Sequence, residues 1–207
     1  MPHSLLDLLQ PASHADQGKF YGVVMGLVTD NKDPDKMGRV KVQFPWLSDQ
    51  NESWWARIAV PMAGPGRGTY FLPEVDDEVL IAFEHGDMRS PYVLGALWNG
   101  KDAPPADNSD GKNNIRVIHS RSGHLVRLDD TDGDEKIELI DKTGNNSVTI
   151  KSSDNSITIQ CNGKLTLKAA QGVEITSQTD VKIQANTTID TEAGAQFTIK
   201  GAMVNIN

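Results

Sequence analysis

The sequence predicts an all-β protein in two parts: an N-terminal barrel followed by an intertwined trimeric (triple-stranded) β-helix. Two observations support this fold class. Short β-prone segments separated by turn residues fill the first half of the chain, and its last third repeats an apolar-polar-apolar unit about every eight residues. The chain has 207 residues, which is enough for one or two domains.

Residues 18–100 are expected to form a barrel of the OB type. Within Arg39–Phe44, Val40, Val42 and Phe44 alternate with polar residues, which is typical of a half-buried strand. Five β-prone segments follow one another in this stretch: Tyr21–Thr29, Arg39–Phe44, Trp54–Val60, Val79–Phe83 and Pro91–Trp98. Five short strands in about eighty residues suit a small barrel such as the OB-fold.

The segments around this barrel are assigned from their composition. Residues 1–17 carry four leucines before Pro11 in the pattern of a short amphipathic helix. Residues 101–114 are polar, contain two prolines and lack periodicity, as expected of a linker between domains. Residues 115–140 are expected to hold two or three strands that lead into the shaft, with a turn at Asp129–Asp134.

The octads of residues 141–207 predict a needle with an apolar interior. Each octad contributes one or two apolar residues to that interior, with turn residues between them. The predicted shaft core consists of Val148, Ile150, Ile157, Ile159, Leu165, Leu167, Val173, Ile175, Val181, Ile183, Ile189, Phe197, Ile199, Val204 and Ile206. Met203, Val204, Ile206 and Asn207 lie at the end of this predicted shaft and are expected to be covered by another protein, because a shaft that ends there would expose apolar residues and strand edges.

An isolated octad strand has no neighbour on either edge, so it needs other chains for its backbone hydrogen bonds. Closed cyclic symmetry is the usual way in which identical chains supply them. A two-residue apolar stripe on each face fits a triangular prism, which predicts a homotrimer. A single-chain β-solenoid is the alternative, but an eight-residue rung is too short to enclose a core.

Composition bounds the function. The net charge of −8 and the scattered basic residues argue against nucleic acid as a partner. The N-terminus lacks the basic and apolar regions of a secretory signal, and no stretch is apolar for the length of a membrane span, so synthesis in the bacterial cytoplasm is expected. Cys161 is the only cysteine, which rules out an internal disulfide.

The residues that could form a metal-binding or catalytic site are better explained by structural roles. The acidic stretch Asp129–Glu135 has the wrong glycine position for an EF-hand and is expected to be a hairpin turn. His85, His119 and His124 lack a matched ligand set. We therefore expect no catalytic, cofactor-binding or metal-binding residues, and no cofactor. Glu174 and Asp180 resemble a carboxylate pair of a polysaccharide-cleaving enzyme, but a solvated outer face is the simpler interpretation.

Two further features of the barrel have structural interpretations. Gly64–Gly68 is glycine-rich but lacks the Lys-Ser/Thr of a phosphate loop, so we expect a mobile loop of the barrel. The four tryptophans (Trp46, Trp54, Trp55 and Trp98) are candidates for base stacking. Without a basic groove, they are expected to lie in the core or at a subunit interface.

Several motifs in one order resemble the baseplate assembly protein V family of contractile tails, which includes the VgrG-like spikes. The matching segments are Gly22–Val24, Val28–Asp30, Asp33–Val42, Phe44–Trp46, Trp55–Arg57, Phe71–Val79, Phe83–Asp87, Pro91–Gly95, Leu97–Gly100, Ser122–His124 and Leu128–Thr131. The resemblance covers roughly residues 20–207. It departs from some relatives in lacking a lysozyme domain between Trp98 and Ile115 and a His-x-His tip.

The resemblance implies a structural, non-enzymatic spike below the inner tube at the centre of a baseplate. Its expected partners are two further copies of the chain, the inner-tube or hub ring, baseplate proteins, a PAAR-type tip protein and, transiently, the target envelope. The short shaft favours a phage tail-like or extracellular contractile particle over a full VgrG. A polysaccharide-cleaving β-helical tail enzyme and an OB-fold nucleic-acid-binding protein remain the alternatives.

Overall fold

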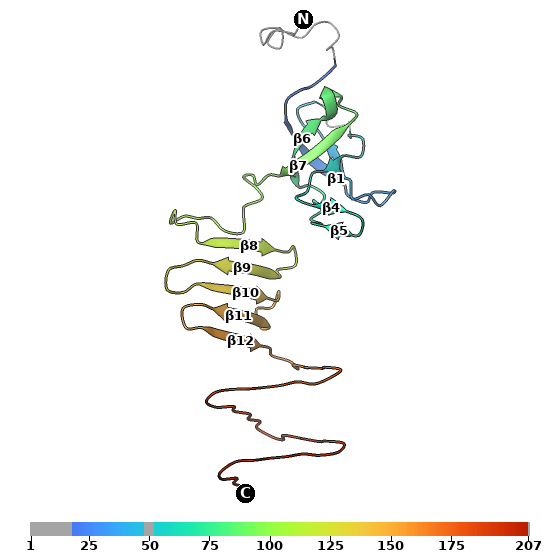
Figure 1. Cartoon of the computed structure of the whole chain (residues 1–207). Coiled ribbons are helices and arrows are strands. Elements are labelled where there is room, and N and C mark those ends of the chain that lie inside the picture. The colour runs from blue at the N-terminus through green and yellow to red at the C-terminus, as the bar shows by residue number, and fades with distance from the viewer. Residues whose placement is uncertain (1–17, 48–51, 207) are drawn as a thin grey trace, which may run out of the picture.

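The computed structural model describes residues 18–47 and 52–206. In these residues a small barrel is joined by a linker to a stack of strands, which continues into a long extended segment (Figure 1). The helix predicted for residues 1–17 and the tip-contact residue Asn207 lie outside the described residues. Among those described, no helix is long and apolar enough to cross a membrane.

Five strands of the first part form one sheet in the order β2-β1-β6-β7-β3. Their bounds are β1 Val24–Asp30, β2 Lys41–Gln43, β3 Arg57–Ile58, β6 Glu78–Phe83 and β7 Pro91–Ala96. All neighbours are antiparallel except β3 and β7, which are parallel. The backbones of Val40 and Ala56 exchange hydrogen bonds of 3.1 and 2.7 Å, which connect the β2 side of the sheet to the β3 side. The sheet therefore closes on itself, as the sequence predicted for an OB barrel.

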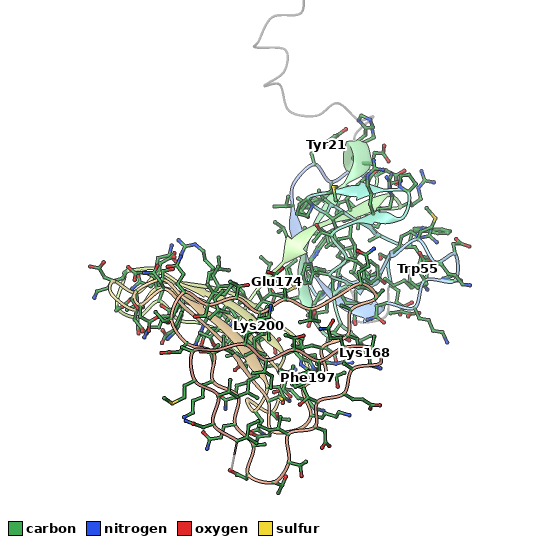
Figure 2. The ribbon with its side chains drawn as sticks, turned by 60° about the horizontal axis from the view of Figure 1, so that its bottom comes forward. Tyr21, Trp55, Lys168, Glu174, Phe197 and Lys200 are labelled. Atoms are coloured by element: carbon green, nitrogen blue, oxygen red, sulfur yellow. The ribbon has the colours of Figure 1, made fainter. Side chains whose placement is uncertain are left out.

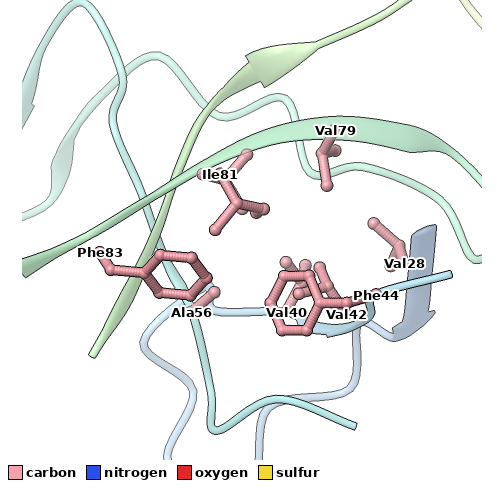
Figure 3. Packing of buried hydrophobic residues seen from close by; sticks show 9 residues of the cluster. Val28, Val40, Val42, Phe44, Ala56, Val79, Ile81 and Phe83 are labelled. Carbon is pink, nitrogen blue, oxygen red and sulfur yellow. The ribbon is translucent and has the colours of Figure 1, made fainter. Parts of the chain in front are cut away.

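The inside of this barrel is filled by side chains from every wall (Figure 3). The buried residues are Val28, Val40, Val42, Phe44, Ala56, Val79, Ile81, Phe83 and Val93. The alternating strand Arg39–Phe44 contributes three of them, which confirms the predicted half-buried strand. Burial of this cluster gives the barrel a hydrophobic core of its own within one chain.

The loop between β1 and β2 is organised by one carboxylate. Asp33 accepts hydrogen bonds from the backbone amides of Asp35, Met37 and Arg39. It also binds the Arg39 guanidinium at 2.7 Å, and its side chain is only 3% exposed. The hydrogen bonds from the Arg39 side chain hold the pKa of Asp33 far below its ordinary value. This loop is therefore fixed in shape.

The glycine-rich segment forms a hairpin of β4 (Ala63–Gly64) and β5 (Arg67–Gly68). Gly66 adopts a φ of 66° at its turn, a conformation that glycine enters readily. A Cβ on Gly68 would lie 2.6 Å from the carbonyl oxygen of Met62, so only glycine fits there. The glycine-rich segment, which the sequence predicted to be a mobile loop, is thus a two-stranded hairpin with its turn at Gly66.

The second sheet is an antiparallel meander in the order β12-β11-β10-β9-β8. The strands are β8 Ile115–His119, β9 Leu125–Asp129, β10 Lys136–Ile140, β11 Ser147–Lys151 and β12 Ser156–Gln160. The connection between β9 and β10 contains Asp130–Glu135, so the acidic stretch is a hairpin turn as predicted. Intrachain pairing extends past the expected boundary at residue 140, since β11 and β12, assigned to the octads, pair with strands of their own chain.

Beyond Cys161 the chain continues without secondary structure to residue 206. It runs back and forth below the stacked strands in wide passes, drawn in brown to red in Figure 1. The turned view of Figure 2 shows that these passes curve around an open centre rather than lie in one plane. This segment holds most of the predicted shaft core.

The buried core predicts how the barrel responds to truncation. Ile81→Ala removes a fully buried side chain and should lower the free energy of unfolding by about 2–5 kcal/mol. All four tryptophans lie in the barrel, so their fluorescence during urea unfolding reports on this domain. Leu94→Ala, at a side chain that is 45% exposed, is the matched control and should change the value by less than about 0.5 kcal/mol. Equal effects would contradict the described core.

The Asp33 loop predicts a pH dependence. The lowered pKa of Asp33 stabilises the fold above the pKa of the unfolded carboxyl, about 3.9, and this contribution is lost as the pH falls through the folded pKa. Asp33→Asn should therefore weaken the barrel at pH 7, and its difference from the parent should narrow below about pH 4. Asp35→Asn, at a carboxylate that is 67% exposed, should have a smaller effect. Urea unfolding at several pH values measures the free energy of unfolding of both variants. If the difference between Asp33→Asn and the parent did not change with pH, the stabilising role of the Asp33 carboxylate would be refuted.

Candidate assembly interface

One face of the second sheet is apolar from its first strand to its last. In the register of the five strands, Ile118 lies opposite Val126, Leu128 opposite Ile137, and Val148 opposite Ile159. The complete set on this face is Ile118, Val126, Leu128, Ile137, Leu139, Val148, Ile150, Ile157 and Ile159, with Arg116 at one corner. We call these nine apolar residues the apolar ladder. It is two residues wide on β9–β12, because alternate residues of a strand share a face.

The apolar ladder is the exposed side of the sheet. Within one chain Ile137 is 46% exposed, Ile157 70% and Ile159 57%, whereas the residues of the opposite face on β9 and β10 are half-buried. An antiparallel sheet of a soluble protein normally turns its apolar face to a core. A contiguous apolar face of this kind indicates a surface that another protein chain covers.

The opposite face bears ion pairs between strands and is polar on β11 and β12, while Ile115, Val117, Leu125 and Ile140 lie on it at the β8–β10 end. Arg127 of β9 pairs with Glu138 of β10. Asp134 bridges Lys136 and Lys151, at 2.8 and 2.7 Å. Hydrogen bonds from these two lysines lower the pKa of Asp134 to about 2. The charges make this face better suited to water than the apolar ladder is.

The same apolar pattern continues below the sheet, without any partner in the chain. Every residue from 162 to 206 is exposed, and none takes part in a backbone–backbone hydrogen bond. The large apolar side chains are exposed by 48% to 86% at Leu165, Leu167, Val173, Ile175, Val181, Ile183, Ile189, Phe197, Ile199, Met203, Val204 and Ile206. We call residues 162–206 the open segment. Its backbone groups and its apolar side chains both require partners that one chain lacks.

The fifteen predicted shaft-core residues fall into two groups. Val148, Ile150, Ile157 and Ile159 belong to the apolar ladder and the other eleven to the open segment. The prediction missed the ladder residues of β8–β10, although Val126/Leu128 and Ile137/Leu139 show the same i, i+2 spacing. Of the predicted tip contacts, Met203, Val204 and Ile206 are exposed.

The residues that the sequence offered as candidates for metal binding or catalysis do not form such a site in the described part of the chain. Among residues 18–47 and 52–206, no group of three or more His, Cys, Asp or Glu side chains is placed to hold a metal ion. The Nδ1 atom of His124 accepts a hydrogen bond from the Lys142 amide at 3.3 Å, in a turn of the sheet. Glu174 is hydrogen-bonded to Thr176 on the exposed open segment.

The tryptophans divide between two environments. The Trp46 ring lies 5.6 Å from that of Phe20 and 6.1 Å from that of Phe44, at the margin of the core. Trp55 lies under the side chains of Arg39 and Lys41, at 5.9 and 5.6 Å. Trp54 and Trp98 are 67% and 71% exposed. The first two pack against the barrel, while the last two are open to solvent in one chain.

Comparison with known proteins identifies the first domain. Residues 24–98 match the family model of the Type VI secretion system/phage-baseplate injector OB domain. The chain is also 32% identical, over 51% of its length, to the Type VI secretion system spike protein VgrG3 of Vibrio cholerae. It is 33% identical over 56% of its length to VgrG5, and 27% over 59% to VgrG1a, two such spike proteins of Pseudomonas aeruginosa.

The chain is a relative of the VgrG-like baseplate spikes. The resemblance noted in the sequence is thereby confirmed. The aligned stretches of 113 to 134 residues are longer than residues 24–98, so the likeness extends beyond the OB domain. They cover 11%, 16% and 21% of VgrG3, VgrG5 and VgrG1a, so the chain matches only a small part of these relatives.

The two faces of β12 give a direct test of the interface in this VgrG-like chain. Ile159→Asp places a charge in the apolar ladder and should abolish self-association, because a charge buried in an apolar interface without a partner is costly. Thr158→Asp, on the opposite face of the same strand, should leave association intact. Both side chains are exposed in one chain, so an isolated chain would tolerate the two changes equally. Sedimentation velocity distinguishes the outcomes.

Proposed function

We propose that the protein is a homotrimeric, non-enzymatic spike of a contractile injection machine. The observation that carries this proposal is the continuity of the apolar ladder with the open segment, which together lack an interior in one chain. In the proposed trimer the ladders of three sheets face a common axis. The open segments of the three chains wind about the same axis and supply one another with backbone hydrogen bonds.

The number of chains follows from the shape of the apolar stripe. A stripe two residues wide per rung is too narrow for a flat two-sheet sandwich, but it fits one face of a triangular prism. Three copies related by a cyclic axis would bury equivalent stripes and pair the edges of the open segments. Figure 1 shows the open segment as separate passes that do not pair with one another, which is consistent with strands of other copies between them.

The place of the spike is inferred from its relatives. Its OB domain belongs with injector domains of secretion systems and phage baseplates, which supports a structural role in such a machine. We propose that three barrels form a collar below the inner-tube or hub ring and contact baseplate proteins. The shaft points away from the tube, meets the target envelope on sheath contraction and carries a PAAR-type tip protein near Met203, Val204 and Ile206. Assembly takes place in the bacterial cytoplasm, and the machine is a phage tail or a secreted tail-like particle.

The shaft has the dimensions that piercing needs. Strands that stack along its axis are separated by about 4.8 Å, so the eight apolar units of the predicted shaft core would measure roughly 35–40 Å. The hydrocarbon layer of a bilayer is about 30 Å thick. A rigid prism of this length would cross that layer, and its polar outer residues keep it soluble before firing.

A mass measurement tests the trimer. Light scattering of the purified full chain should give about three times the 22.6 kDa of one chain. Because ladder and open segment form one interior, the particle should resist dilution and show no folded monomer. A soluble monomer with an ordered C-terminal half would overturn the proposal. Turnover of surface polysaccharide by the purified trimer would contradict its non-enzymatic part.

A further inference from the structure

The barrel carries a groove that its core packing does not explain. The groove has a volume of about 750 Å³ and lies between the Asp33 loop, the β4–β5 hairpin and the segment after that hairpin. Its lining includes Lys36, Met37, Arg57, Arg67, Tyr70 and Phe71. These side chains come from three separate stretches of the sequence, and the OB topology brings them together.

The groove is cationic on a chain of net charge −8. Its lining contains four basic side chains and no carboxylate. Arg39 is matched by Asp33 and Asp35. The ion pairs of the described residues do not include the other three, Lys36, Arg57 and Arg67. An occupant with negative charge is therefore favoured.

The groove is also aromatic and pre-shaped. Met37 is 65% exposed, Tyr70 76% and Phe71 63%. The hydrogen bonds of Asp33 organise the loop that carries Met37, and backbone pairing of Ala63 with Gly68 and of Gly64 with Arg67 forms the hairpin. Little ordering cost would remain when a ligand enters such a site.

The chain contains one segment with the matching chemistry. Residues 102–110 read DAPPADNSD, with three aspartates and no basic residue around Pro104-Pro105. All nine residues are exposed. Adjacent prolines favour an extended polyproline conformation, and proline-rich segments of this kind dock into grooves lined by aromatic side chains. The acidic ends would meet the basic rim while the prolines cover Tyr70 and Phe71.

The occupant comes from a neighbouring copy. No linker residue lines the groove of its own barrel. The start of the linker is held at Asn99, whose side chain accepts hydrogen bonds from the amides of Lys101 and Asp102. From there the linker turns away from β4 and β5 (Figure 1). Seven residues from Gly100 to Ala106 can span roughly 20 Å, which is enough to reach across a collar of small barrels.

We propose that, in the trimer, the acidic proline-containing linker of one copy lies in the basic aromatic groove of the next copy. This inference rests on the proposed homotrimer. The three linkers then tie the barrels into a collar, independently of the shaft. Such a clasp fixes the orientation of the barrels relative to the needle, so that thrust from above is transmitted to the shaft.

Cysteine cross-linking between tagged chains tests the proposal. In a Cys161→Ser background, chains carrying Tyr70→Cys and chains carrying Ala106→Cys are co-expressed with different tags. Mild oxidation should join the two tags in one covalent species. Val23→Cys, at a side chain 56% exposed and outside the groove, replaces Tyr70→Cys in the control pair and should not cross-link.

A disulfide forms only where two Cβ atoms lie close together. Proteolysis therefore serves as a second measurement of docking that does not depend on this distance. Docking should protect Lys101 and Lys112 from trypsin. The double variant Lys36→Glu/Arg67→Glu should accelerate cleavage at these lysines about tenfold. A loss of about 1.4 kcal/mol in the docking free energy raises the fraction of undocked linker tenfold. Lys32→Glu, an exposed charge of the same loop outside the groove, should leave the rate unchanged.

The two proposals fail in different ways. A monomer by light scattering would refute the proposed function, and the clasp with it. A trimer without the Tyr70–Ala106 cross-link, and with equal trypsin rates in both charge variants, would overturn the clasp alone. That outcome would leave the groove to a different occupant, such as a protein of the tube or baseplate.

Discussion

The structure depends on one constraint: the apolar ladder has no covering partner within the chain, and the open segment below it pairs with no strand of its own chain. The apolar ladder lies on the more exposed face of its sheet. In the open segment the backbone lacks partners as well, since no residue from 162 to 206 makes a backbone–backbone hydrogen bond. Ordering such a segment costs conformational entropy that only burial against other chains can offset.

The boundary between intrachain and interchain pairing lies at β12. This strand pairs with β11 on one side, and its other edge has no partner in the chain. The exit from β12 is held by a short network in which Asn162 donates its amide hydrogen to the side chain of Asn146, which in turn binds Asp141. The network directs the chain downward from the sheet. In the proposed trimer, the next rung comes from another copy.

Sequence patterns were sufficient for the barrel and for the repeat, because both depend on local alternation of apolar and polar residues. They were insufficient for the boundary between sheet and open segment. Val148/Ile150 and Ile157/Ile159 look like octads, yet their strands reverse direction and pair within the chain. The strands there start at Leu125, Lys136, Ser147 and Ser156, and each of these steps of 11, 11 and 9 residues holds a reversing turn.

The groove on the barrel was beyond sequence reasoning for a different reason. The glycine-rich composition of Gly64–Gly68 was visible in the sequence. Lys36, Arg57 and Tyr70, however, become neighbours only through the closure of the sheet. Long-range contacts of this kind leave no periodicity to detect.

The two halves of the molecule differ in what a single chain can bury, and this division fits the proposed spike. The barrel buries its core within one chain, so it can fold before assembly. In the proposed trimer the shaft acquires an interior only when chains associate, which would make its rigidity a property of the assembled particle. The ion pairs of Asp134 and Arg127 lie on the face opposite the apolar ladder, which is the outer face in that trimer. We propose that such a chain avoids a stable but incomplete needle, because the proposed shaft needs the strands of all three copies.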